Sequence, residues 1–106
     1  MRSGDSTVKN LIAVPSLGET ALLLLLGRVV YRYREKLGLL KGDLASRAKL
    51  TTADIVALEQ GEWDIDIVSL IAISKGLQVS LNELMSVFEE ELMHAALQSQ
   101  AVFEDR

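Results

Sequence analysis

The chain has no cysteine and only one histidine among its 106 residues, and these shortages exclude several kinds of chemistry. Without cysteine there is no disulfide framework, no thiolate nucleophile and no zinc site built on sulfur. The single histidine, His94, lies between Met93 and Ala95, where a surface histidine is a simpler interpretation than a base or a ligand. Glu89 to Glu91 are consecutive, so on a helix they point in different directions and form no metal cage or acid-base pair. We therefore predict no enzyme activity, no metal and no cofactor.

Long hydrophobic runs are also absent. The longest uninterrupted apolar run, residues 21–26, is far shorter than the roughly 20 residues that cross a bilayer. It begins too late for a secretory signal, and no small-residue cleavage site follows it. We expect no membrane segment and a cytoplasmic location. A length of 106 residues with 49% hydrophobic content suits one compact domain.

The charge is unevenly distributed along the chain. The net charge of −4 argues mildly against a nucleic-acid binder. However, residues 1–61 carry a net charge of +3 and residues 62–106 carry −7. The basic part therefore contains whatever surface could face an acidic partner.

Hydrophobic spacing predicts an all-α chain. The five expected helices span residues 17–36, 40–48, 52–60, 67–76 and 81 to beyond 100. Residues 1–16 precede them as an arm, partly disordered or with a short extended segment that stops at Pro15, the only proline.

Capping patterns support four of these helix starts. They are Ser16 with Glu19, Thr51 with Asp54, Asp66 alone, and Ser80 with Glu83. The helix at 40–48 lacks such a signal, because Leu40 occupies the cap position, so it must depend on packing. Gly61 and Gly76 are expected to end the third and fourth helices. The fourth helix is expected to supply core side chains at Ile67, Leu70, Ile71 and Ile73.

The first and last helices carry more apolar surface than one small domain is expected to bury. The front half of the first helix is a leucine run, and the last helix repeats apolar residues every three or four positions: Leu81, Leu84, Met85, Phe88, Leu92, Ala95 and Ala96. We therefore predict a homodimer, with apolar contacts that include Leu22, Leu23, Leu25, Phe88 and Leu92.

Residues 44–61 contain two short helices joined by a tight turn, which is a helix-turn-helix. Around it the chain resembles the Xre/Cro-type helix-turn-helix family of phage repressors and bacterial regulators, without gaps from about residue 26 to 85. The resemblance rests on Arg34, Leu44, Ala45, Leu50, Thr51, Ile55, Leu58, Glu59, Gly61, Leu70, Leu77, Val79, Ser80 and Leu84. It implies a five-helix repressor-like domain at 17–85, with a leucine-rich extension of the first helix and a C-terminal helical extension at 86–106 as a possible dimerisation element.

The resemblance also implies functional positions. An ion pair between Arg34 and Glu59 would tie the first helix to the recognition helix. The helix at 52–60 would enter the major groove of double-stranded DNA. Thr52, Ala53 and Ala57 would lie nearest the bases, with Thr51 at the helix start and Lys41 and Gln60 near phosphates. This implies a dimeric DNA-binding transcriptional regulator.

The outward residues of this helix depart from the family pattern. Members usually carry Gln, Arg, Ser or Asn there, because bidentate donors distinguish bases. This chain offers a hydroxyl and methyl groups, followed by an acidic loop with Glu62, Asp64 and Asp66. The alternative is a protein-interaction module on the same fold, an antitoxin, anti-activator or anti-repressor, that binds a regulatory protein partner through Trp63 and Ile65 in that loop.

Overall fold

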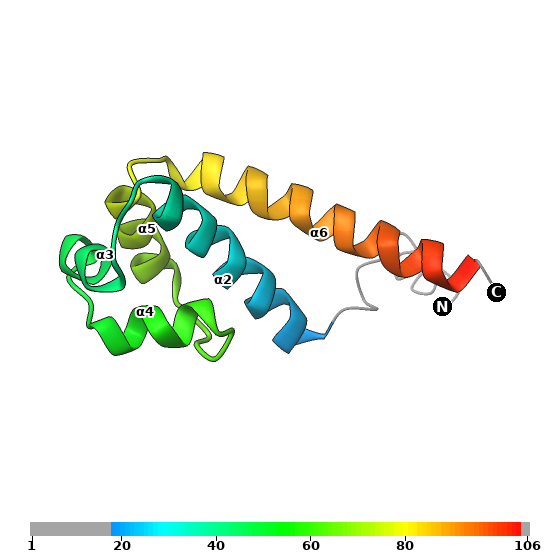
Figure 1. Cartoon of the computed structure of the whole chain (residues 1–106), viewed down its shortest axis with the longest axis horizontal. Helices are drawn as coiled ribbons and strands as arrows, with labels where there is room; N and C mark the ends of the chain where they lie inside the picture. The colour runs from blue at the N-terminus through cyan, green and yellow to red at the C-terminus, as the bar shows by residue number, and fades with distance from the viewer. Residues whose placement is uncertain (1–17, 105–106) are drawn as a thin grey trace, which may run out of the picture.

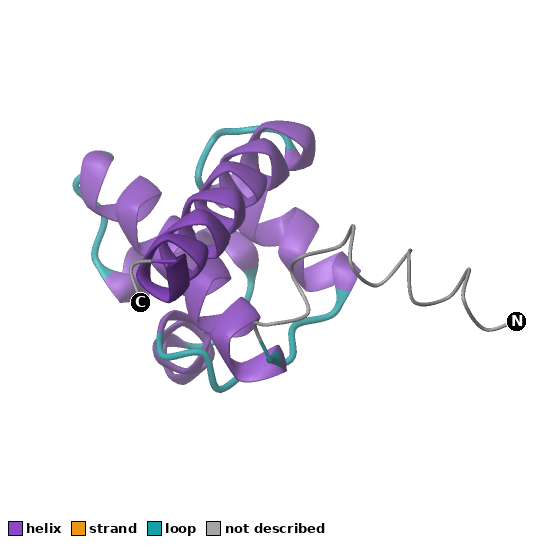
Figure 2. Cartoon of the chain, turned by 90° about the vertical axis from the view of Figure 1, so that its right-hand side faces the viewer, coloured by secondary structure: helices purple, strands orange, loops and turns teal. Residues whose placement is uncertain are grey.

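The structure is a computed structural model that describes residues 18–104, with side chains as far as residue 98. This part of the chain contains five helices. They are α2 (Glu19–Lys36), α3 (Lys41–Ala48), α4 (Thr52–Glu59), α5 (Ile67–Gly76) and α6 (Leu81–Glu104), labelled as in Figure 1. These residues contain no strand (Figure 2). The all-α, five-helix prediction is confirmed. The predicted N-terminal arm lies outside the described residues, and the predicted domain boundary after residue 85 falls inside α6.

The helix α2 runs through the middle of the molecule and contacts both halves of it. The helix-turn-helix pair α3 and α4 lies on one side, with α5 packed against α3. On the other side α6 runs along α2 and continues well past the body of the domain (Figure 1). The helix α2 therefore positions α4 and α6, whereas α3 and α5 are held by α4, by each other and by α6.

Three helix starts follow the predicted capping chemistry. At α4 the Thr51 hydroxyl oxygen accepts the N–H of Asp54, and the Asp54 carboxylate accepts the N–H of Thr51, each at 3.0 Å. At α5 the Asp66 carboxylate accepts the N–H of Ser69 at 3.0 Å, and at α6 the Ser80 hydroxyl accepts the N–H of Glu83 at 3.0 Å. Each side chain satisfies a donor that has no partner within its helix.

The other two starts differ from prediction. The helix α2 begins at Glu19, with Gly18 as its N-cap and no side-chain cap. The capping box predicted at Ser16 and Glu19 is therefore wrong about where this helix starts, and Ser16 itself lies outside the described residues. At α3, Leu40 is the N-cap, and the Asp43 carboxylate accepts its N–H at 2.9 Å. This bond is one of the two hydrogen bonds of a capping box. It supports the start of α3, which was predicted to depend on packing alone.

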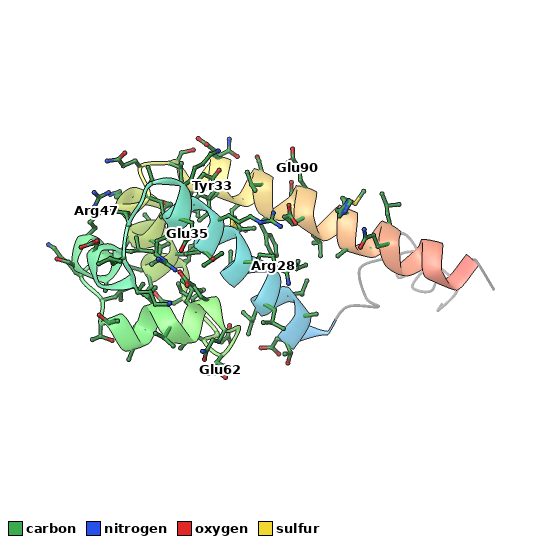
Figure 3. The ribbon with its side chains drawn as sticks, viewed as in Figure 1. Arg28, Tyr33, Glu35, Arg47, Glu62 and Glu90 are labelled. Carbon is green, nitrogen blue, oxygen red and sulfur yellow. The ribbon has the colours of Figure 1, made fainter. Side chains whose placement is uncertain are left out.

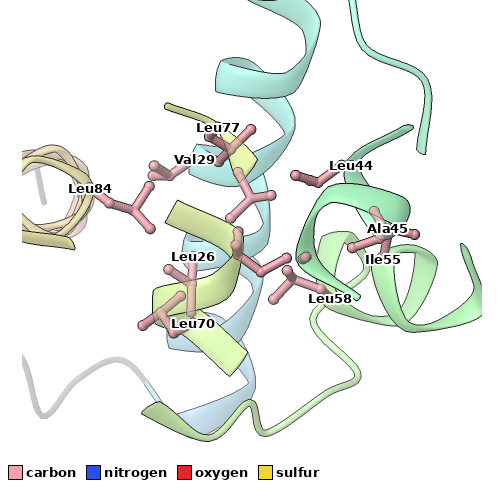
Figure 4. Packing of buried hydrophobic residues seen from close by; sticks show 12 residues of the cluster. Leu26, Val29, Leu44, Ala45, Ile55, Leu58, Leu70, Leu77 and Leu84 are labelled. Carbon is pink, nitrogen blue, oxygen red and sulfur yellow. The ribbon is translucent and has the colours of Figure 1, made fainter. Parts of the chain in front are cut away.

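The core lies where α2 meets the other helices (Figure 4). Its buried apolar members are Leu26, Val29, Val30, Leu44, Ala45, Ala48, Ile55, Leu58, Leu70, Ile73, Leu77 and Leu84. Two predicted core residues of α5 are wrong, because Ile67 is 59% exposed and Ile71 is 37% exposed. The buried face of α5 instead includes Ser74, whose hydroxyl donates to the Ile71 carbonyl at 2.8 Å. That local bond allows a polar side chain to be buried in place of an isoleucine.

Polar contacts connect α2 to α6 (Figure 3). Tyr33 Oη donates to Glu83 at 3.3 Å, and Arg32 pairs with Glu91 at 2.7 Å. Partial burial and the neighbouring Glu83 raise the pKa of Tyr33. The leucine-run side chains that were predicted to form a dimer contact, Leu22, Leu23 and Leu25, are half-buried, as are Phe88 and Leu92 of α6.

Among the described residues, no single helix is both long and apolar enough to cross a membrane. Only α5 and residues 81–98 of α6 taken together are long and apolar enough, and the chain bends by 99° between them.

Gly27 sets the distance between α2 and α4. A Cβ atom at this position would lie 2.3 Å from the Leu58 carbonyl oxygen and 2.9 Å from the Glu59 Cα. Both atoms belong to backbone and cannot rotate away, so only glycine permits this approach. The sequence does not reveal this constraint, because nothing local to Gly27 indicates which backbone lies opposite it.

We expect Gly27→Ala to destabilise the protein by about 1–3 kcal/mol, as overpacking of a core typically does. Gly42→Ala is the control, because its Cβ would meet only the Thr52 hydroxyl at 3.6 Å, an ordinary contact. The control should change the free energy of unfolding by less than about 1 kcal/mol, since alanine favours a helix. Urea unfolding of both variants measures this, and equal effects would contradict the close approach.

Candidate nucleic-acid interface

The turn between α3 and α4 is built around Lys49. This residue ends α3 in the left-handed conformation, with φ 60° and ψ 42°. The N–H of Leu50 then returns to the Ala45 carbonyl at 2.8 Å, and Thr51 begins α4. The left-handed conformation costs more free energy for a lysine than for a glycine, so contacts of the neighbouring residues must stabilise this tight turn. The result is a helix-turn-helix whose second helix has a free outward face.

The residues predicted to contact DNA mostly lie on exposed surface. Thr51, Thr52 and Ala53 are exposed at the start of α4, and Ala57 is half-buried one turn later. Lys41, in the first turn of α3, and Gln60, just after α4, are also exposed and line a common hollow between α2 and α4.

Two members of this surface were not in the predicted site. Val56 is half-buried and lines the same hollow, and the helical spacing of Thr52, Val56 and Gln60 could have revealed it. Arg28 reaches the hollow from α2. Arg28, Arg32 and Lys36 are four residues apart in the sequence and so form a basic stripe on one face of α2, but this spacing does not indicate which helix lies beside the stripe.

The ion pair expected between Arg34 and Glu59 is present, and it joins α2 to the end of α4. Arg34 Nε and Nη2 lie 2.7 and 3.1 Å from the two Glu59 carboxylate oxygens, and Nη1 donates to the Leu39 carbonyl at 2.8 Å. The two side chains are only 5% and 7% exposed. The hydrogen bond to Glu59 raises the pKa of Arg34, and the guanidinium also lies 5.4 Å from the centre of the Tyr31 ring. A fork-shaped cation fits this bidentate role better than lysine would.

The acidic flank is less available to a ligand than its sequence suggests. Ser69 donates both its N–H and its hydroxyl to Asp66, which lowers the pKa of that carboxyl and keeps it charged as the α5 cap. Asp54 is likewise held by the Thr51 N–H. Glu62 and Asp64 remain as exposed acids after α4 (Figure 3).

Trp63 and Ile65 do not form an exposed apolar pair. Both are half-buried and pack against the core. The sequence pattern favoured an interaction surface because acids alternate with these two residues, but alternation in a loop does not reveal which side faces the protein. The prediction of an exposed contact surface there is wrong.

Arg47 has a structural role. Its guanidinium Nη1 donates to the Gly76 carbonyl at 2.9 Å and so ties α3 to the end of α5 (Figure 3). No group of three His, Cys, Asp or Glu side chains within the described part of the chain could hold a metal ion. The surface thus carries hydroxyl, amide, methyl and cationic groups, with the exposed acids Glu62 and Asp64 beside them.

Comparison with solved structures identifies the family. A point mutant of the restriction-modification controller protein C.Esp1396I is 32% identical over 73% of this chain and 95% of that one, with a TM-score of 0.59. This chain belongs to the helix-turn-helix regulator family. Another structure of the same controller protein, a tetramer in complex with its natural 35-base-pair operator, is 29% identical over 68% of this chain and 95% of that one, with a TM-score of 0.65.

A more distant member of the comparison shares the fold alone. The clp gene regulator ClgR from Corynebacterium glutamicum is 18% identical over 76% of this chain and 86% of that one, with a TM-score of 0.71. No protein-family model matches the chain, and no curated protein matches its sequence. The family assignment therefore depends on the controller-protein structures and on the helix-turn-helix geometry.

We expect Glu59→Gln to cost about 3–5 kcal/mol of unfolding free energy, because it leaves the buried Arg34 charge with only the exposed Glu35 carboxylate, 3.7 Å away. The control is Glu91→Gln, which breaks the exposed Arg32 pair and should cost no more than about 1 kcal/mol. Urea unfolding monitored by circular dichroism compares them. A Glu59→Gln variant as stable as the control would show that the pair does not hold α4 on α2.

Proposed function

We propose that this chain is a dimeric, non-enzymatic transcriptional regulator of the Xre/Cro type that acts in the cytoplasm by binding double-stranded DNA through α4. The observation that carries this is the exposed face of a helix-turn-helix whose recognition helix is fixed from behind by Arg34 and Glu59. The controller protein solved on its operator supports DNA as the ligand.

The composition of the outward face suggests how the DNA sequence is distinguished. Ala53, Ala57 and the methyl group of Thr52 can pack on thymine methyls, whereas none of them makes a bidentate hydrogen bond to a base. We therefore assign most of the affinity to phosphate contacts, with Lys41 and Gln60 at the hollow between α2 and α4 and Thr51 near the start of α4. Such a protein would select thymine-rich half-sites and depend strongly on salt.

A salt series with matched duplexes tests this proposal. A duplex enriched by the wild-type protein from a randomised pool should bind with an affinity that falls linearly with salt on logarithmic axes. Replacing thymine by uracil at the contacted positions removes one methyl each, which should weaken binding about fourfold per position at about 0.8 kcal/mol per methyl. The control is the same replacement outside the protected region. No enrichment, or no salt dependence, would overturn the proposal.

The protein-interaction alternative loses the observation that motivated it. Trp63 and Ile65 are half-buried against the core, so the loop does not present an apolar centre within an acidic rim. The donor-poor face of α4 remains, but thymine contacts account for it without a protein partner.

Dimerisation was predicted from the leucine run and α6, and the structure adds a third apolar surface. Ile67, Val68 and Ile71 of α5 are 59%, 72% and 37% exposed and lie within one turn and a half of a helix. Both ends of α5 are fixed, by the Asp66 cap and by Arg47 on the Gly76 carbonyl. We propose that this rigid apolar surface meets its equivalent in a second copy, because an exposed cluster of this kind usually marks a contact.

We expect Val68→Lys to shift the protein from dimer to monomer, since two copies would place like charges together in a desolvated contact. Met93→Lys on α6, where the native side chain is 62% exposed, is the matched control and should remain dimeric. Sedimentation velocity measures both. If Met93→Lys were monomeric and Val68→Lys dimeric, the dimer contact would lie on α6 instead of α5. A monomeric wild type would contradict dimerisation.

A further inference from the structure

The hollow between α2 and α4 joins a helix outside the helix-turn-helix to the DNA-facing surface. It has a volume of about 360 Å³. Its polar lining comes from three elements: Arg28 and Tyr31 of α2, Lys41 of α3, and Glu59 and Gln60 at the end of α4. Val56 lies on its wall, one turn before Gln60 and one turn after Thr52, so the hollow continues the outward row of α4.

Backbone packing fixes where Arg28 stands. Gly27 lies directly against the backbone of Leu58 and Glu59, at the end of α4. Because Arg28 is the next residue of the same rigid helix, its Cα cannot move away from the end of α4 without breaking that contact. Among the glycines of the described chain, Gly27 makes the closest approach to another helix, and this contact positions Arg28 beside the hollow.

The electrostatics of the hollow favour an anion. Its acid, Glu59, is already engaged by both arms of the Arg34 guanidinium. Within residues 18–98, neither Arg28 nor Lys41 has a carboxylate within 4.0 Å, whereas Arg32 on the same stripe pairs with Glu91. The two exposed cations therefore face the hollow without a counter-ion, and the neutral donors of Gln60 and Tyr31 stand beside them.

We infer that Arg28 and Lys41 together bind one phosphate of the DNA backbone at the end of α4. The distance along α4 from Thr52 to Gln60 is about 12 Å. At about 3.4 Å of helix axis per phosphate on one strand, this corresponds to about three to four phosphates, so a strand that passes the start of α4 can reach the hollow. A guanidinium can bind phosphate oxygens in a bidentate manner, and a lysine adds a point charge. This inference rests on the proposed function and extends the contact surface onto α2.

The test compares Arg28→Ala with Arg32→Ala, its neighbour one turn along α2. Fluorescence anisotropy with the duplex enriched by the wild-type protein, and with a scrambled duplex of equal composition, gives the affinity and its salt slope. Arg28→Ala should reduce the slope by part of the roughly 0.9 that one phosphate contributes, because Lys41 remains, and should weaken both duplexes by the same factor, up to about tenfold near 0.1 M salt, because a phosphate contact carries no sequence information. Arg32→Ala should leave the slope unchanged.

Two further variants separate charge from structure. Arg28→Lys should restore the slope while recovering only part of the affinity, whereas a purely structural role would leave the slope reduced. Arg28→Ala combined with Lys41→Ala should lose about one phosphate in slope, since both side chains share it. An Arg28→Ala slope equal to that of a DNA-binding wild type overturns this inference alone. A wild type with no salt-dependent binding overturns the proposed function instead.

Discussion

The buried pair of Arg34 and Glu59 is the interaction on which the arrangement of the functional surface depends. It joins the central helix α2 to the end of α4 through two short hydrogen bonds, and the third arm of the guanidinium holds the Leu39 carbonyl before α3 begins. One cation thus connects three consecutive parts of the fold. Since a buried charge without its partner is costly, the pair favours a single placement of α4 over nearby alternatives.

Gly27 reinforces the same placement by steric means. The ion pair attracts the end of α4 toward α2, and the missing side chain at Gly27 lets the two backbones meet. This close approach places Arg28 beside the DNA-facing surface and engages Glu59 in an internal bond. The hollow thus presents Arg28 and Lys41 as cations, while its acid, Glu59, is paired with Arg34, although the whole chain is acidic.

The outward face of α4 carries few hydrogen-bonding side chains. Asp54 and Asp66 act as helix caps, bound to backbone donors at the starts of α4 and α5. What remains outward on α4 is a threonine, alanines and a valine, flanked by cations from α3 and α2. Methyl contacts would supply selectivity and phosphate contacts would supply affinity, which is a coherent division for a small regulator.

The sequence by itself determined the helices and the tie between them. Capping residues such as Thr51, Asp66 and Ser80 act on donors three residues away, so the helix starts could be predicted. The resemblance to the helix-turn-helix family implied the pairing of Arg34 with Glu59. Tertiary structure alone decided which faces are covered. Ile67 and Ile71 repeat at helical spacing yet remain exposed, whereas Trp63 and Ile65 are half-buried against the core. It also decided that Arg28 borders α4 while Arg32 pairs with Glu91, since periodicity defines a face but not what packs against it.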